Sequence, residues 1–194
     1  MRVKMLLLVL CVLFMVASVG FSYDTTGGMK GGITVSNISG EHSGLGNYSD
    51  NVGYGFSIGP FARIGTADGH LAIQTEFLYT LTGNDIYTVC CPEEYYLLQI
   101  FSIEIPVLVM VRFPISETEI APFLYGGSSV GIKYLDSDKD TPMDINFFQV
   151  GGILGAGLDF GLNTLEFRYS KDLRMIDQDL SRKTYMFLYS RHFQ

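Results

Sequence analysis

Residues 102–113 alternate between apolar and mixed positions. The odd positions, from Ile103 to Phe113, are all apolar, whereas Glu104 and Arg112 fall on even positions. A period of two predicts a β-strand with one apolar face and one mixed face. The segment is longer than the ~5–6 residues usual in globular sheets and matches the ~9–11 residues that a tilted strand needs to cross a bilayer. The alternative for this segment alone is an inner strand of a soluble β-sandwich or lipocalin-like barrel.

The same pattern along the chain predicts eight strands. They lie at 29–39, 53–65, 71–82, 96–113, 120–134, 146–161, 164–172 and 183–193. An even number of antiparallel strands is what a single-chain bacterial barrel requires. We therefore predict an all-β fold, an eight-stranded antiparallel up-and-down transmembrane β-barrel.

The predicted connections alternate in length along the chain. The long, polar ones are 40–52, 83–95, 135–145 and 173–182, and the short ones are 66–70, 114–119 and 162–163. Outer-membrane barrels have long extracellular loops and short periplasmic turns. This alternation places both mature termini in the periplasm.

Aromatic residues on the apolar rows form two predicted girdles at the edges of the lipid band. Tyrosines dominate the long-loop end and phenylalanines the short-turn end. The long-loop set is Tyr54, Tyr79, Tyr95, Tyr134, Phe148, Tyr169 and Tyr185, and the short-turn set is Phe113, Phe160 and Phe193.

The opposite rows carry charges that point into the predicted lumen. The lumen of an eight-stranded barrel is only just wide enough for side chains to fill, so we expect the charges to pair and plug it. The predicted set is Arg63, Glu76, Glu104, Arg112, Lys133, Asp159, Glu166 and Arg168. Lys30 also faces inward, and we expect it near the periplasmic rim in water. Inner-row glycines such as Gly155 and Gly157 make room for large side chains opposite.

The first 22 residues have the order of a secretory signal. Arg2 and Lys4 precede an apolar run over 5–19, which ends in small residues and is shorter than the ~20 residues of a spanning helix. We expect a signal peptide at 1–22 and a barrel domain at 23–194. Removal of the signal peptide leaves a mature chain with 11 basic and 20 acidic residues. A chain with this net negative charge is a poor nucleic-acid binder.

Several short segments resemble the PorT-like outer membrane β-barrel domain family. The resemblance covers essentially the whole mature chain, with the segments in the family's order. They are 28–33, 73–79, 103–106, 121–127, 155–160 and 165–169. It implies an eight-stranded outer-membrane barrel of a Gram-negative bacterium, for most members without a defined activity. The chain departs from the family in ending Phe193-Gln194 and in carrying a Cys-Cys pair in the segment 83–95.

No catalytic, cofactor or metal site is predicted. His192 lies at the periplasmic end of the last predicted strand, and neither His42 nor His70 has a fixed serine and acid at a telling spacing. The acidic run at 136–140 lacks the glycine and the later glutamate of a calcium loop. Cys90 and Cys91 are candidates for a loop disulfide, within the loop or between molecules.

We therefore expect a small integral outer-membrane protein with a structural or binding role and no enzymatic activity. Its expected partners are outer-membrane lipids and the outer-membrane assembly machinery. The alternatives are an outer-membrane lipid-modifying enzyme and a soluble periplasmic lipid-binding barrel.

Overall fold

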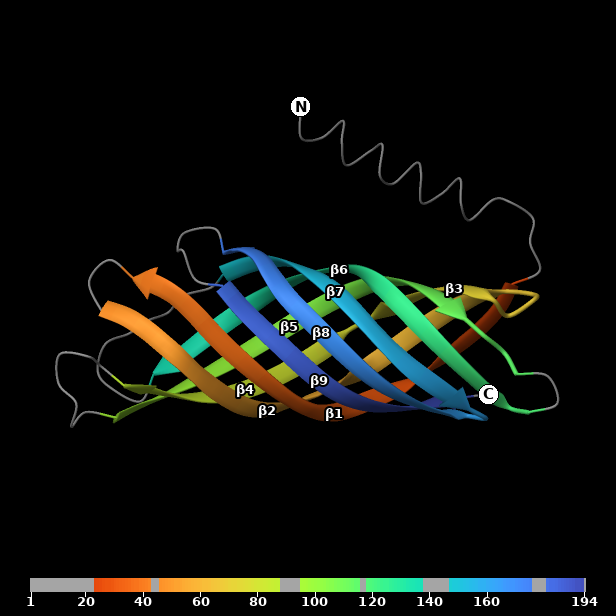
Figure 1. Cartoon of the computed structure of the whole chain (residues 1–194), viewed down its shortest axis with the longest axis horizontal. Coiled ribbons are helices and arrows are strands. Elements are labelled where there is room, and N and C mark those ends of the chain that lie inside the picture. Colours follow the sequence, from red (N-terminus) through yellow and green to blue (C-terminus); the bar gives the residue numbers. More distant parts are fainter. Residues whose placement is uncertain are drawn as a thin grey trace, which may run out of the picture.

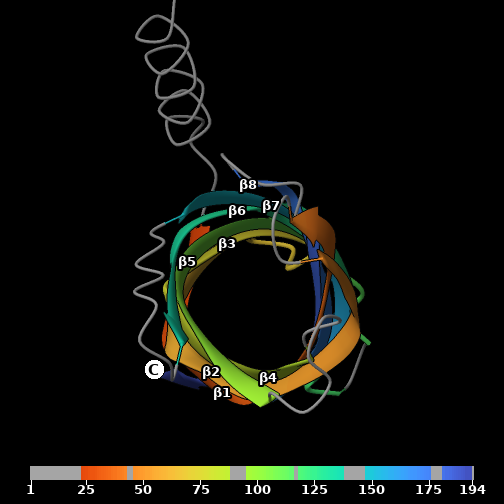
Figure 2. The same ribbon diagram turned by 90° about the vertical axis from the view of Figure 1, so that its left-hand side faces the viewer.

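The strands pair antiparallel with their neighbours and close into a ring, as Figures 1 and 2 show. The computed structural model describes residues 23–42, 46–87, 95–115, 118–137, 147–175 and 181–193. The strands are β1 Tyr23–His42, β2 Gly46–Thr66, β3 Leu71–Glu76, β4 Leu78–Tyr87, β5 Tyr95–Arg112, β6 Ile120–Ser137, β7 Phe147–Phe160, β8 Asn163–Met175 and β9 Ser181–Phe193.

β3 and β4 are two halves of one barrel strand. Both lie between β2 and β5, in a single register on each side of the break at Phe77. The Phe77 N–H donates to the Pro60 carbonyl at 3.0 Å, but Pro60 has no N–H to return the bond. On the other side the register sets Glu76 opposite Pro106. The predicted closed eight-stranded antiparallel barrel is confirmed, with a local gap in its hydrogen-bond ladder.

The first and last strands close the barrel. β1 pairs with β9 from Gly27 opposite Phe193 to Ser39 opposite Ser181. The beginning of β1 and the end of β9 therefore lie at one end, together with residues 67–70, 113–115, 118–119 and 161–162 (Figure 1). We call this the turn end and the opposite end the loop end.

The strands continue further toward the loop end than the sequence pattern predicts. β1 and β2 contain 20 and 21 residues and pair up to His42 opposite Gly46. The predicted long loop at 40–52 is therefore wrong, because most of that segment is a paired strand with a register shift between Ile38 and Gly40. The other three predicted long connections also begin or end in strand, and 88–94, 138–146 and 176–180 lie outside the described residues.

The turn after β2 is held by side chains as well as by backbone. The Thr66 hydroxyl and the His70 N–H both donate to the Asp68 carboxylate, and they hold the pKa of Asp68 below its usual value. Gly69 has a φ of 71° and Gly161, in the turn after β7, has a φ of 61°. Glycine takes this left-handed conformation without steric cost, so both tight turns rest on it.

The two faces of the sheet have opposite character. Outward residues such as Ile33, Val109 and Leu154 are largely exposed, whereas Arg168, Lys133 and Gln149 are fully buried inside. This is the reverse of a soluble barrel and leaves an apolar surface for lipid. The lumen also contains an apolar cluster that the sequence pattern did not predict: Ala72, Leu108, Met110, Phe123, Tyr125 and Ile153.

Two inner glycines of β7 create the space for the rings of β6. A Cβ at Gly155 would lie 2.3 Å from Cζ of Tyr125, and one at Gly157 would lie 2.3 Å from Cζ of Phe123. These glycines lie directly opposite the two aromatic residues in the register. They make room for large side chains, as predicted. Tyr125 can therefore reach the charged residues Glu166 and Arg168 of β8 in the lumen.

Candidate functional site: the charged lumen

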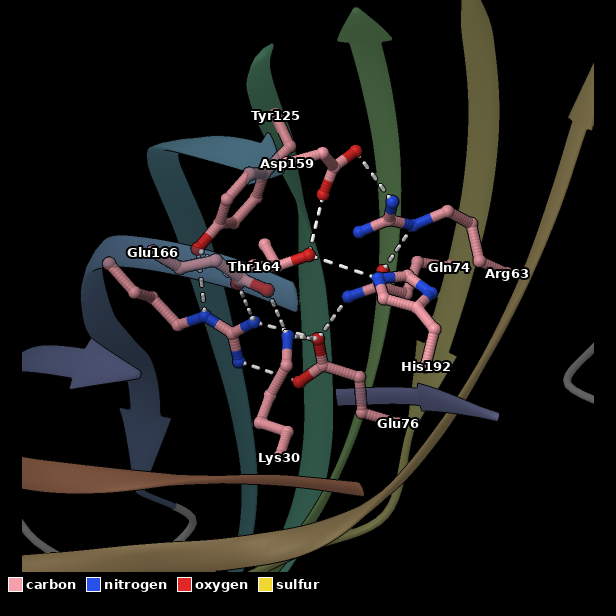
Figure 3. A network of polar contacts seen from close by, with 10 residues as sticks. Lys30, Arg63, Gln74, Glu76, Tyr125, Asp159, Thr164, Glu166 and His192 are labelled. Carbon is pink, nitrogen blue, oxygen red and sulfur yellow. Dashed lines mark hydrogen bonds and ion pairs between the residues drawn. The ribbon is translucent and has the colours of Figure 1, made fainter. Parts of the chain in front are cut away.

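A cluster of charges from three strands lies in the lumen, and Figure 3 shows it. We define the central cluster as Lys30 of β1, Glu76 of β3, and Glu166 and Arg168 of β8. Lys30 Nζ lies 2.7 Å from Glu76 Oε1 and 2.5 Å from Glu166 Oε1. Arg168 donates to both oxygens of Glu76, at 2.8 and 2.7 Å. Two cations therefore share two carboxylates, and each group contacts two others.

Neutral side chains complete the bonding of the central cluster. Gln74 Nε2 donates to Glu76 at 2.6 Å, and Arg168 Nε donates to the Tyr125 hydroxyl at 3.1 Å. That hydroxyl donates to Glu166 Oε2 at 3.1 Å. The cations also pack on rings, with Lys30 5.4 Å from the Phe61 centroid and Arg168 5.5 Å from that of Tyr125. Charge-assisted bonds of this kind are about twice as strong as neutral ones, so the cluster links β1, β3, β6 and β8 firmly.

The prediction that Lys30 lies in water near the rim is wrong. Its exposed fraction is only 2%, and both carboxylates of the central cluster contact it. The alternation along β1 indicates that Lys30 faces inward, but the height of a residue in the barrel depends on the stagger of the strands. Lys30 is therefore a central member of the network rather than a solvated rim residue.

A second cluster lies toward the turn end. Asp159 Oδ2 accepts from Arg63 at 2.9 Å and from Arg112 Nε at 3.0 Å, so one carboxylate serves two guanidinium groups. Arg63 also donates to Gln74 at 2.8 Å, which connects this cluster to the central one. Arg63 Nη2 is buried without a hydrogen-bond partner. We define the turn-end cluster as Arg63, Arg112, Asp159, Thr164 and His192.

His192 belongs to a hydrogen-bonded chain with Thr164 and Asp159. Thr164 donates to Asp159 Oδ1 at 2.6 Å and lies 2.9 Å from His192 Nε2. In an acid–base–nucleophile triad the imidazole stands between the acid and the hydroxyl. Here the hydroxyl stands in the middle and gives its proton to the carboxylate, so His192 is not placed to activate it. The Thr164 side chain is also completely buried.

A third cluster lies toward the loop end and contains Lys133, Asp172, Gln149, Glu104 and Arg182. Lys133 and Gln149 both contact the Asp172 carboxylate. Glu104 accepts a bond at 3.2 Å from Ser102, which lies opposite Lys133 in the register of β5 and β6. Arg182 donates to Thr184 at 2.9 Å, but its Nη1 and the Gln149 Oε1 have no hydrogen-bond partner. We call this set the loop-end cluster.

The structure brings seven of the eight predicted lumen residues into ion pairs. Glu104 is the exception, since within the described parts of the chain no cation lies within 4.0 Å of it. The sequence prediction missed Arg182 and Asp172, which lie in or beside the predicted loop 173–182. The alternation of β9 carried the signal for Arg182, because it shares the inward row of Thr184 and Met186.

The predicted girdle residues lie on the outward row where the structure describes their side chains. Tyr54, Tyr79, Phe148, Tyr185, Phe113 and Phe193 are exposed, and Tyr169 and Phe160 are half-buried. The side chains of Tyr95 and Tyr134, and both Cys90 and Cys91, lie outside the described residues. Tyr189 is exposed among the residues of β9 nearer the turn end. The separation into a tyrosine rim and a phenylalanine rim is therefore not strict.

The described residues contain no group of three or more His, Cys, Asp or Glu residues that could hold a metal ion. They also contain no helix with the length and apolar character needed to cross a membrane.

Comparison with protein families identifies the barrel. Residues 25–177 match the family described as outer membrane protein beta-barrel domain. The chain belongs to this family. It is accordingly an outer-membrane protein, and the soluble periplasmic barrel is excluded as an alternative.

Solved structures support the fold. Neisserial surface protein A is similar with a TM-score of 0.54 at 13% identity, covering 88% of this chain and 99% of that one. The attachment invasion locus protein Ail of Yersinia pestis, solved with the heparin analogue sucrose octasulfate, gives 0.52 at 14% identity with the same coverage. At this identity the likeness shows the fold alone. A comparison with curated proteins finds no match.

Proposed function

We propose that this protein is a structural or binding barrel of the outer membrane, with a lumen plugged by its own side chains and with its partner chemistry in the loops. The central cluster is the observation that carries the proposal. Its four charged side chains come from three strands on different sides of the barrel and meet across the lumen. A water-filled porin-like channel of this size would have to break these contacts.

Side-chain volume supports the same proposal. Eight strands enclose an interior about as wide as the side chains that fill it. Here the interior is filled by the three charged clusters and by large apolar side chains such as Leu108, Met110 and Phe123, all of which are buried. We therefore propose that the barrel does not conduct ions steadily.

We also propose that the chain is not an enzyme. The imidazole of His192 lies beside the Thr164 hydroxyl and the Asp159 carboxylate, and the order of these groups is unsuited to activating a nucleophile. His70 meets the Asp68 carboxylate through its backbone N–H, and its ring nitrogen Nδ1 lies 3.3 Å from the Arg112 carbonyl oxygen. These observations argue against the lipid-modifying alternative at the turn end. We propose that the protein binds its partners through the connections at the loop end.

The orientation and processing complete the proposal. We propose that the chain is a PorT-like member of its family, that residues 1–22 are removed as a signal peptide, and that the assembly machinery inserts it with both termini in the periplasm. The turn end, where β1 begins and β9 ends, is then periplasmic, and the loop end is extracellular.

Conductance in a planar bilayer tests the plugged lumen. We expect purified protein to show little or no steady current, because the central cluster crosses the lumen. As a positive control, the double variant Lys30→Ala and Arg168→Ala removes both cations of that cluster and should raise the frequency of channel openings if it still inserts. Large stable channels in the unaltered protein would refute the proposal.

Tag accessibility tests the orientation. A tag inserted at 43–45 or 176–180 should be reached by antibody on intact cells, and one at 161–162 should be reached only after the outer membrane is opened. The barrel should also run faster on a gel before boiling than after. The reverse labelling pattern would mean that the barrel is inverted.

A further inference from the structure

The outward faces of β8 and β9 pair residue by residue into a ladder. Going from the turn end toward the loop end, Leu165 lies opposite Tyr189, Phe167 opposite Phe187, Tyr169 opposite Tyr185, and Lys171 opposite Lys183. Three pairs of large apolar or aromatic side chains therefore end in a pair of cations. We call Lys171 and Lys183 the lysine pair.

The lysine pair is an unfavourable arrangement on its own. Both side chains are exposed and stand directly opposite one another, and like charges in such cross-strand positions are destabilising. Among the side chains that the structure describes, no carboxylate lies within 4.0 Å of either lysine. An anion bound between the two ammonium groups would relieve this repulsion.

Charge is scarce elsewhere on the outward face. Where its side chains are described, the charged residues on the strands are Lys171, Lys183 and Arg191, all on β8 and β9 and all basic. Arg191 lies opposite Asn163, near the turn end of the same two strands. The rest of the described outward rows is apolar or neutral, so the lysine pair is a localised basic site.

The aromatic part of the ladder is continuous with the lysine pair. The ring centroids of Tyr169 and Tyr185 are 5.3 Å apart, and those of Phe167 and Phe187 are 5.0 Å apart. Tyr185 also stacks on Phe167, with centroids 6.4 Å apart. Tyrosines are enriched at the membrane–water interface, where their rings lie at the level of the headgroups. The lysine pair, one step beyond the tyrosines, is therefore at the height of lipid phosphates.

We propose that the lysine pair binds the phosphate of an anionic membrane lipid whose acyl chains lie along the ladder. Both ammonium groups donate to the phosphate oxygens, and the rings of Phe167 and Phe187 contact the chain below. The proposal rests on the proposed function for one point only, the leaflet: with the loop end outside, the lipid belongs to the outer leaflet. The adjoining aromatic ladder favours a lipid over a free phosphate ion, which would need only the lysines.

Lipid retention measured by native mass spectrometry tests this inference. Full-length mature protein would be released from nanodiscs of equal parts phosphatidylglycerol and phosphatidylcholine. We expect the unaltered protein to retain phosphatidylglycerol preferentially. The double variant Lys171→Gln and Lys183→Gln should lose that preference about tenfold or more, since a lysine near an anionic surface contributes about 1 kcal/mol. Arg191→Gln is the matched control, an outward cation on the same strand, and should retain the preference.

The thermal midpoint in zwitterionic detergent provides an independent readout. Without anionic lipid the double variant should melt at the same temperature as the unaltered protein or higher, because like-charge repulsion is gone. Added phosphatidylglycerol should then raise the midpoint of the unaltered protein but not of the variant. Equal lipid-dependent stabilisation of both proteins would overturn the inference. A full effect from inorganic phosphate alone would also overturn it, in favour of a free-anion site.

These results are separable from the proposed function. Lipid retention from nanodiscs does not depend on which end of the barrel faces outward, nor on whether the lumen conducts. An inverted barrel in the tag experiment would reassign the leaflet and leave the lysine pair as a phosphate site. Loss of the lipid preference in the Arg191 control as well would show that general surface charge, and not the lysine pair, attracts the lipid.

Discussion

The central and loop-end clusters both hold two cations and two anions, but they are bonded very differently. Around Glu76, four hydrogen bonds from three side chains fill both oxygens. In the loop-end cluster, Glu104 accepts one bond from Ser102, and Arg182 leaves a buried Nη1 without a hydrogen-bond partner. Equal charge therefore does not give equal bonding. The geometry of donors and acceptors decides which cluster holds the barrel together.

The difference follows from where the side chains meet. In the central cluster a planar guanidinium faces a carboxylate and binds it through two nitrogens, which is the strong geometry for this pair. In the loop-end cluster the lysine and the glutamine converge on one aspartate, and Glu104 and Arg182 stand apart from it. We expect the central cluster to dominate stability and the loop-end cluster to tolerate change.

Glu76→Ala should have the largest effect. This substitution leaves Lys30 with one carboxylate and removes the carboxylate that Arg168 binds in a bidentate manner. Removing one member of a buried pair typically costs ~3–5 kcal/mol. Urea unfolding in lipid vesicles, followed by circular dichroism and by the gel shift between folded and boiled protein, would measure this loss.

The neighbouring substitution Thr75→Ala is the control for Glu76→Ala. Thr75 is on the same strand but exposed on the outward face, so its unfolding free energy should change little. Replacing Glu76 and Arg168 together by glutamine and methionine should cost less than the two single changes added. Additive effects would mean that the two residues do not act as a pair.

Glu104→Ala should have a smaller effect of ~1–3 kcal/mol, the usual penalty for removing one buried hydrogen-bond partner. The same unfolding experiment measures it, with the exposed neighbour Ile105→Ala as the control for strand position. An effect as large as that of Glu76→Ala would refute the contrast between the two clusters. It would show that long-range attraction to Lys133 matters more than direct contact.

Arg182→Met should have the smallest effect, about 1 kcal/mol. Methionine keeps an unbranched apolar stem but removes the guanidinium, and the only hydrogen bond that the structure describes for Arg182 is the one to Thr184. Arg168→Met, which loses four hydrogen bonds, is the matched comparison and should cost several times more. Similar losses for the two arginines would contradict the comparison directly.

Strand identity and facing were predictable because both depend on local alternation. The segment around Glu104 has the predicted strand period, and Val107, Val109 and Val111 are exposed as the pattern indicates. Alternating positions along a strand show which residues face inward. They do not show how far along the barrel axis a residue lies, so the prediction put Lys30 at the rim instead of in the central cluster.

The ends of the strands were not predictable for a different reason. Alternation is strong only where one face meets lipid and the other the lumen. Beyond the lipid band both faces can be polar, so the glycine- and asparagine-rich segment 40–52 has no period although much of it is paired. Arg182 was missed because the predicted strand began one residue too late, at 183, although the alternation of β9 extends to Arg182. The loop-end cluster therefore combines Glu104 and Lys133, which the alternation predicted, with Asp172 and Arg182, which lie at or just beyond the ends of the predicted strands.

The pairing of Lys30 with Glu166 has a consequence for assembly. The two residues are 136 positions apart in the chain, and Arg168, 92 positions from Glu76, joins the same cluster. Lys30 and Glu76 thus remain without their β8 partners until nearly the whole chain has been delivered. Exposing a charged side chain to hydrocarbon costs about 2.5–3.5 kcal/mol or more, so strands inserted singly would meet a steep barrier. The strands that carry Lys30 and Glu76 must therefore stay shielded from lipid until β8 arrives. The barrel sheet and the central cluster are then completed in the same step.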